Sequence, residues 1–157
     1  MTEARSMVLE KRKIIQRNTQ RMGIDDRFIS KLVDEFYFRI RDHDELGPIF
    51  DDVIGEGWES HLLKMKSFWS SVAMNTGTYS GQPVPVHQSL SNVDEVHFDI
   101  WISLFEQTLW DIAPTDDVIP YFMERAERIA QSLKLAMFGA PELRFMKKSE
   151  ENYGPQK

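Results

Sequence analysis

The spacing of apolar residues is the feature that most constrains how this chain can fold. Over residues 29–40 apolar side chains recur at three- and four-residue steps, and the same period returns in three later stretches. That period matches one face of an α-helix, whereas a half-buried strand needs alternation over four to eight residues. No alternating run long enough to argue for a sheet is present. The sequence therefore predicts an all-α protein.

Capping and turn residues divide this pattern into separate helices. Asp25 or Asp26 is suited to begin the first long helix, and Gly139 to end the last. The Gly47-Pro48 pair, with the leucine before it, is expected to end the first helix and start a short corner. The third long helix has so little polar surface that we expect it to be central and buried. The predicted helices cover residues 26–42, 58–72, 93–112 and 116–138, with a brief one over 84–90 after a loop rich in glycine and proline.

Length and composition favour one soluble domain. The 157 residues suit a single core, and no apolar run approaches the roughly 20 residues of a membrane-spanning helix. Charged residues interrupt the first 13 positions, where a secretory signal would need an apolar stretch, so we expect a cytoplasmic protein. The chain has no cysteine, which excludes disulfides, thiolate nucleophiles and iron–sulfur clusters.

Charge is distributed unevenly. The net charge of -6 argues against a nucleic-acid-binding protein, because affinity for phosphates comes mainly from lysine and arginine. Residues 1–24 hold six bases and two acids, a net +4, which leaves -10 for the remainder. We expect a basic helical extension over 1–24, a main domain over 25–139 and a polar tail over 140–157. The extension could be a solvated helix, dock on its own acidic domain, or contact a membrane surface or a partner.

The four histidines suggest a cofactor site. His43 and His97 are expected at the surface, while His61 lies within an otherwise apolar helical face and His87 follows a turn containing two prolines. Either of the last two alone is typical of packing or of a loop. Together, on successive helices, they could face each other across a flat apolar cofactor. Haem needs one neutral imidazole and an apolar slot, whereas no pair of histidines has the spacing of a compact zinc site.

Several short motifs occur in the order found in one protein family. The sequence resembles the truncated haemoglobins, in particular their third group, over residues 28–138. The resemblance implies a shortened globin fold, in which two pairs of helices enclose a haem. Two features depart from the family pattern: only three residues join the corner to the helix that carries His61, and residues 1–24 exceed the minimal family chain. The matching motifs are Phe36-Tyr37, Arg39-Ile40-Arg41, Leu46-Gly47-Pro48-Ile49-Phe50, Trp58-Glu59-Ser60-His61, Phe68-Trp69, Tyr79-Ser80-Gly81-Gln82-Pro83, His87, Phe98-Asp99-Ile100-Trp101 and Leu104-Phe105.

The resemblance also implies roles for individual residues. His87 would be the proximal ligand of the iron, and Phe50 would lie against the porphyrin. Polar residues would surround the ligand on the distal side, an apolar residue would follow one turn beyond His61, and a lysine would meet a haem propionate. The distal residues are Tyr37, His61 and Trp101, and the remaining positions are Met65, Lys64 and, at the pocket floor, Phe98.

This assignment implies a protein that holds haem b and reversibly binds oxygen, nitric oxide and carbon monoxide at a five-coordinate iron. Tyrosine and tryptophan donors near the ligand would stabilise bound oxygen by about 1 kcal/mol or more each in a dry pocket. The same polar pocket suits a haem enzyme, such as a nitric oxide dioxygenase or a peroxidase, served by a separate reductase. A haem-free helical interaction module is a third alternative. The residues alone do not decide between them.

Overall fold

The computed structural model describes residues 3–76, 87, 90 and 92–139. The described part of the chain forms helices and no strand, so the all-α prediction is confirmed. The helices are α1 (Glu3–Arg21), α2 (Asp26–Asp42), α3 (Leu46–Ile54), α4 (Trp58–Met74), α6 (Glu95–Ile112) and α7 (Val118–Phe138).

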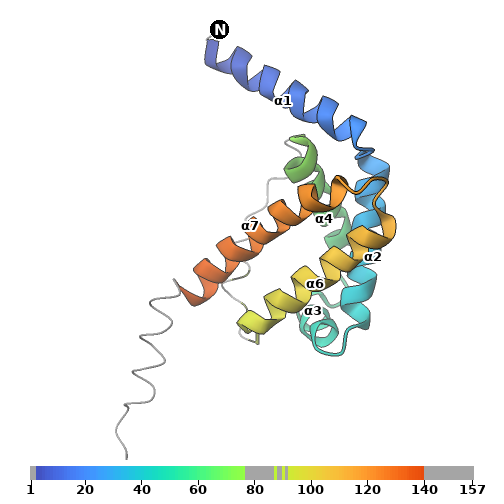
Figure 1. The fold of residues 1–157 in the computed structure, drawn as a ribbon. Coiled ribbons are helices and arrows are strands. Elements are labelled where there is room, and N and C mark those ends of the chain that lie inside the picture. Colours follow the sequence, from blue (N-terminus) through green and yellow to red (C-terminus); the bar gives the residue numbers. More distant parts are fainter. Residues whose placement is uncertain (1–2, 77–86, 88–89, 91, 140–157) are drawn as a thin grey trace, which may run out of the picture.

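The long helices form two packed pairs. Helix α6 runs antiparallel to α7, and both cross in front of α2 and α4, which pack on each other (Figure 1). Aromatic rings join the two pairs at the centre, where Trp69 of α4 stacks on Phe105 of α6 with ring centroids 4.9 Å apart. Phe36 of α2 meets the same Phe105 ring edge-on at 5.0 Å. The result is a sandwich of two helix pairs, the arrangement that the sequence resemblance implies.

Helix α2 begins where a capping residue was predicted. The Asp25 carboxylate accepts a hydrogen bond from the backbone N–H of Phe28 at 2.8 Å, which satisfies one of the free donors at the helix start. Both bounds of α2 match the prediction. Its buried stripe places Tyr37 on the side that faces α3 and α4.

The segment after α2 differs from the expected corner, because Leu46–Ile54 forms a helix of its own. Pro48 falls in its first turn, where a missing N–H is tolerated. Gly47 is required by space: a Cβ there would lie 2.5 Å from the carbonyl oxygen of Arg41. The glycine therefore allows α3 to start directly against the end of α2 and brings Phe50 over Tyr37.

Helix α6 is central, as expected, because it packs against α2, α3 and α7, but it is less buried than its composition suggests. Phe105 and Leu109 are fully buried, but Val96 is 52% exposed and Trp110 is 61% exposed. Neighbouring helices α2 and α7 cover only part of the α6 surface, and the remainder faces solvent. Apolar content alone did not reveal which faces have neighbours.

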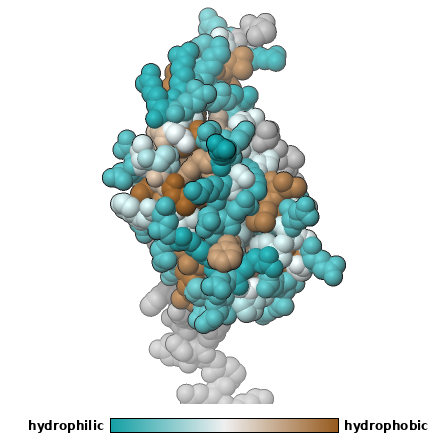
Figure 2. Space-filling view, turned by 90° about the vertical axis from the view of Figure 1, so that its right-hand side faces the viewer, coloured by the Kyte–Doolittle hydropathy of each residue, from teal (hydrophilic) through white to brown (hydrophobic). Residues whose placement is uncertain are grey.

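Helix α1 extends away from the body of the molecule (Figure 1). Its residues 3–11 are exposed, whereas its second half packs against α4 and buries Thr19. The face shown in Figure 2 is largely hydrophilic, and its described apolar side chains form separate groups. No helix in the described ranges is long and apolar enough to cross a membrane. The expected polar tail and most of the brief 84–90 helix lie outside the described residues.

Candidate functional site

A cavity of about 230 Å³ lies between the helix pairs. Its described walls come from α2, α3, α4, α6 and α7 together with His87, Leu90 and Val93, and they are almost entirely apolar. Lys64 does not line the cavity and is exposed. Every other predicted site residue lines it, namely Tyr37, Phe50, His61, Met65, His87, Phe98 and Trp101.

Four rings from three helices form a cluster, and three of them line this cavity. Tyr37 of α2 meets the His61 imidazole of α4 edge-on, with ring centroids 5.2 Å apart. Phe50 of α3 and Trp58 of α4 contact the same tyrosine at 6.1 and 6.0 Å. The start of α4 is thereby packed on α2 and α3, which fixes where His61 lies.

The Tyr37 side chain is only 5% exposed. Burial raises the pKa of its hydroxyl above the ordinary value of 10.0, because desolvation disfavours the phenolate. The hydroxyl therefore remains protonated at any physiological pH. It makes no hydrogen bond to another residue in the described part of the chain, so this O–H is available as a donor to a molecule in the cavity.

His61 presents a neutral imidazole to the cavity. Burial lowers the pKa of this side chain below its ordinary value of 6.5, and the charges of Lys64 and His87 lower it further. Its Nε2 atom is buried without a hydrogen-bond partner among the described residues. Buried polar atoms of this kind normally have a partner, so the site is suited to an occupant that supplies one.

His87 brings a second imidazole to the cavity. It is helical, and its carbonyl oxygen accepts a hydrogen bond from the N–H of Leu90 at 3.1 Å. Its influence on the His61 pKa shows that the two side chains lie within electrostatic reach of each other. The prediction that both histidines belong to one site is therefore supported by their shared cavity.

Trp101 is held by stacking on the α6 side of the cavity. Its indole lies parallel to the Phe105 ring at 5.6 Å and meets Phe36 edge-on at 5.3 Å. Phe98, one turn earlier on the same helix, is 8% exposed. Met65 follows His61 by one turn of α4 and adds an apolar wall. These side chains give the cavity fixed and mostly apolar sides.

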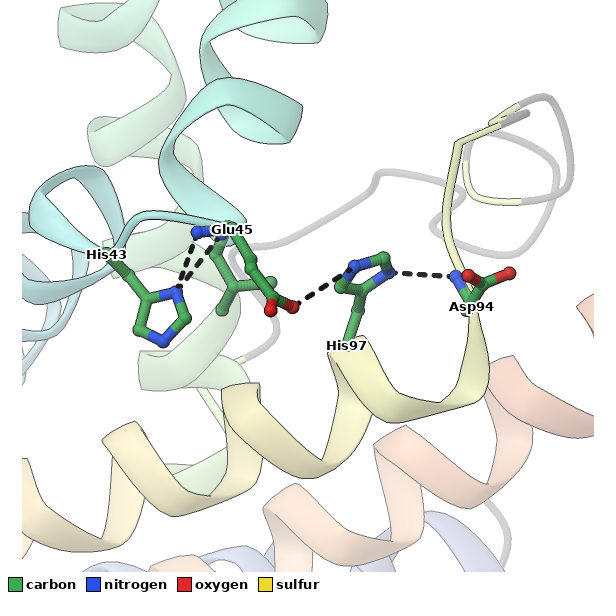
Figure 3. A network of polar contacts seen from close by, with 5 residues as sticks. His43, Glu45, Asp94 and His97 are labelled. Carbon is green, nitrogen blue, oxygen red and sulfur yellow. Dashed lines mark hydrogen bonds and ion pairs between the residues drawn. The ribbon is translucent and has the colours of Figure 1, made fainter.

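The structure corrects the expectation that His97 lies free at the surface. Its side chain is 15% exposed and lines the cavity. Its Nδ1 accepts a hydrogen bond from the N–H of Asp94 at 2.9 Å, and its Nε2 lies 3.8 Å from a carboxylate oxygen of Glu45 (Figure 3). His43 accepts from the N–H of Glu45 at 3.1 Å, so both histidines support helix starts near the cavity rim. The signal in the sequence was the Asp94-x-x-His97 spacing, which resembles a capping box.

The residue chemistry fits a planar apolar cofactor that carries a metal. No group of three or more histidine, aspartate or glutamate side chains suited to a bare metal ion occurs within the described ranges. An apolar slot with imidazoles and one phenol instead matches what haem requires, namely one imidazole ligand and donors on the ligand side. The unsatisfied Nε2 of His61 is the observation that most favours an occupant.

Comparisons with known proteins agree with this geometry. No protein-family model matches the chain. The chain is 33% identical over 118 residues to the group 3 truncated hemoglobin ctb of Campylobacter jejuni, an overlap of 73% of this chain and 92% of that protein. The crystal structure of a group III truncated hemoglobin from Campylobacter jejuni superimposes with a TM-score of 0.69 and 32% identity, again covering 73% of this chain and 92% of that one.

Proposed function

This chain belongs to the group III truncated haemoglobins, a family of globins that implies a haem cofactor. We propose that it holds haem b in the cavity between its helix pairs and reversibly binds oxygen, nitric oxide and carbon monoxide there. One observation carries the proposal: Tyr37, His61 and His87 converge on one apolar cavity. The unpartnered Nε2 of His61 adds a donor or acceptor for an occupant.

His87 is the proximal ligand in this proposal. Its imidazole lines the cavity from the chain segment between α4 and α6, on a helical turn. The haem supplies a ferrous iron with one coordination position open to a diatomic molecule. A five-coordinate iron requires that His61 stays off the metal, and its ring contacts with Tyr37 and Trp58 hold it within the aromatic cluster. We expect His61 to gate access to the ligand position.

Tyr37, His61 and Trp101 form the distal side. The Tyr37 hydroxyl remains protonated because burial raises its pKa, so it donates and never repels a ligand that gains negative charge. The neutral His61 ring carries one N–H, and the Trp101 indole carries another. Three donors around one ligand favour slow release of oxygen, because each can donate a hydrogen bond to it. Carbon monoxide accepts such hydrogen bonds weakly.

The remaining predicted residues shape the slot. Phe50 would lie against the porphyrin, Phe98 would line the pocket floor, and Met65 would supply an apolar wall one turn beyond His61. Lys64 is exposed and close enough to lower the His61 pKa, a position suited to a haem propionate at the rim. In this proposal residues 25–139 form the globin domain, residues 1–24 and 140–157 are additions to it, and the protein acts in the cytoplasm.

A second candidate function is redox catalysis at the same haem, either nitric oxide dioxygenation or peroxide turnover, with electrons from a separate reductase. The observation that favours it is the neutral, unpartnered imidazole of His61, since a histidine beside a polar ligand pocket can move protons. Fast nitric oxide consumption in the presence of a reductant, with slow oxygen release, would support the enzyme over the carrier.

Optical spectra of the ferric, deoxy, oxy and carbon monoxide forms test the proposal directly. We expect a Soret band in the purified protein and a five-coordinate deoxy spectrum. Absence of haem from protein purified with added hemin would refute it and would favour a haem-free interaction module. A six-coordinate low-spin ferrous form, abolished by His61→Ala, would show that His61 binds the iron.

A further inference from the structure

The indole of Trp58 is held from outside the cavity by two charged residues. Its Nε1–H donates to Oδ1 of Asp51 at 2.9 Å, and the guanidinium carbon of Arg41 lies 4.4 Å from the centroid of its ring. Arg41 and Asp51 also pair with each other, with Nε and Oδ1 3.6 Å apart. Each residue thus contacts the other two, and we call this group the Arg41–Asp51–Trp58 clamp. No member of the clamp lines the cavity.

The same indole also contacts two of the proposed distal residues. The ring centroid of Trp58 lies 5.8 Å from that of His61, with the planes perpendicular, and 6.0 Å from that of Tyr37. Tyr37 and His61 in turn contact each other at 5.2 Å. Each of these three rings contacts the other two, and Phe50 of α3 also stacks on Trp58 at 6.5 Å. We therefore expect a tilt of the indole to displace Tyr37 or His61, the two side chains of the three that line the cavity.

The position of Trp58 along the chain strengthens this link. Trp58 is the first residue of α4, and Gly57 before it supplies no side-chain cap. The bond from the indole to Asp51 therefore fastens the start of α4 to α3. His61 follows three residues later, within the same first turn, so it moves with Trp58 if that fastening is lost.

The ion pair between Arg41 and Asp51 contributes little to the stability of the fold. The side chains of Arg41 and Asp51 are 50% and 53% exposed, and exposed pairs stabilise a fold weakly. A charged acceptor does, however, give a short and directional hydrogen bond to a buried indole. The hydrogen bond to Asp51 therefore fixes the orientation of the Trp58 indole, and Trp58 is only 8% exposed.

We propose that the Arg41–Asp51–Trp58 clamp sets the arrangement of Tyr37 and His61 and thereby controls how tightly the pocket retains oxygen. Asp51 and Arg41 act through Trp58 and are positioning residues. The oxygen-release part of this inference rests on the function proposed above. The contact between the clamp and the two rings does not.

The decisive variant is Asp51→Ala, which removes both the hydrogen bond and the ion pair. We expect oxygen release to become about fivefold faster and to split into two phases, because the rings then adopt more than one arrangement. Asp51→Asn keeps a carbonyl acceptor for the indole and loses only the charge, so its release rate should change by about twofold or less.

A matched control separates positioning from general loss of stability. Asp34 of α2 pairs with Lys66 of α4 at 3.0 Å, so Asp34→Ala likewise breaks an ion pair between α2 and a neighbouring helix. Neither residue takes part in the ring contacts among Tyr37, His61 and Trp58. We expect Asp34→Ala to release oxygen at the wild-type rate. In the double variant Asp51→Ala/Trp58→Phe, release should be no faster than in Trp58→Phe alone, because the effect of Asp51 passes through the indole.

Nuclear magnetic resonance provides a readout that does not depend on oxygen. The Trp58 indole N–H should exchange with solvent about tenfold faster in Asp51→Ala, and the ring signals of Tyr37 and His61 should shift, with neither change in Asp34→Ala. These spectra are recorded on the carbon monoxide form, or on the haem-free chain if no haem is taken up. Lack of haem would refute the proposed function only. Unshifted ring signals, or equal oxygen release in Asp51→Ala and Asp34→Ala, would refute the clamp.

Discussion

Replacing Tyr37 by phenylalanine isolates one hydroxyl group of the proposed distal site. The tyrosine ring is packed against Phe36, Phe50, Trp58 and His61, with centroid distances between 5.2 and 6.1 Å. Phenylalanine keeps that ring and its contacts. The hydroxyl makes no hydrogen bond to another described residue, so its removal leaves no protein group unsatisfied. The folded structure should therefore survive the change.

The size of the effect follows from the burial of this donor. A hydrogen bond contributes about 0.5–1.5 kcal/mol when both groups are neutral, and about 1.5–3 kcal/mol when one is charged. Oxygen that has drawn electron density from ferrous iron lies between these cases, which gives about 1–2.7 kcal/mol. Because 1.4 kcal/mol corresponds to a factor of ten, oxygen affinity should fall about five- to a hundredfold. Most of that change should appear in release.

Stopped-flow mixing of the oxygenated protein with excess carbon monoxide measures release directly. We expect Tyr37→Phe to speed release by the stated factor, since Trp101 and His61 replace the lost donor only in part. Carbon monoxide association serves as the internal control and should barely change, because that ligand gains little from a donor. Release within twofold of wild type would show that Tyr37 is a packing residue, and Trp101 and His61 would then be the donors.

Further changes test the other elements of the site and fold. His87→Ala should lose haem during gel filtration unless imidazole is added, and Soret absorbance measures the loss. His61→Ala should speed carbon monoxide association in flash photolysis while leaving the deoxy spectrum five-coordinate. The pKa of His61 in the folded protein lies below 6.5, so the unfolded chain binds more protons than the folded one when the pH falls below about 6.5. The free energy of unfolding from denaturant titration should therefore decrease below about pH 6.5, and it should decrease less in His61→Phe. Phe105→Ala should lower the free energy of unfolding by about 3–5 kcal/mol by the same method, because its ring is fully buried.

Periodicity predicted the helices well because each one buries a stripe against a neighbour. The stripe of α2 from Phe28 to Ile40 is almost fully buried, and its bounds matched the prediction. Apolar content was less informative for α6, where Val96 and Trp110 have no neighbour to cover them. The α3 helix was missed because Gly47 and Pro48 usually mark a turn, and only the close approach of the Arg41 carbonyl explains the glycine.

Motif order led to residues that share one cavity, but not to the residues that hold them in place. Motif order identified Tyr37 and His61, whose side chains do meet at the cavity. No spacing rule brings together Asp51 and Trp58, which lie on separate helices and meet across the three-residue connection between α3 and α4. His97 was not predicted as a site residue for a similar reason. Its capping role could be inferred from the local sequence, but its place in the cavity wall depends on how α6 packs.

Two hydrophobic clusters of the core meet at the cavity. The larger cluster surrounds Trp69, while a small second cluster consists of Phe98, Ala130 and Leu133. Residues of both clusters line the cavity, and among the described side chains only the half-buried Ile102 and Ile129 pack against both. A planar apolar occupant would touch both clusters at once and remove their facing surfaces from water, which stabilises the folded state. The start of α6 and the end of α7, which carry the small cluster, are therefore the parts of the fold whose order depends most on what the cavity holds.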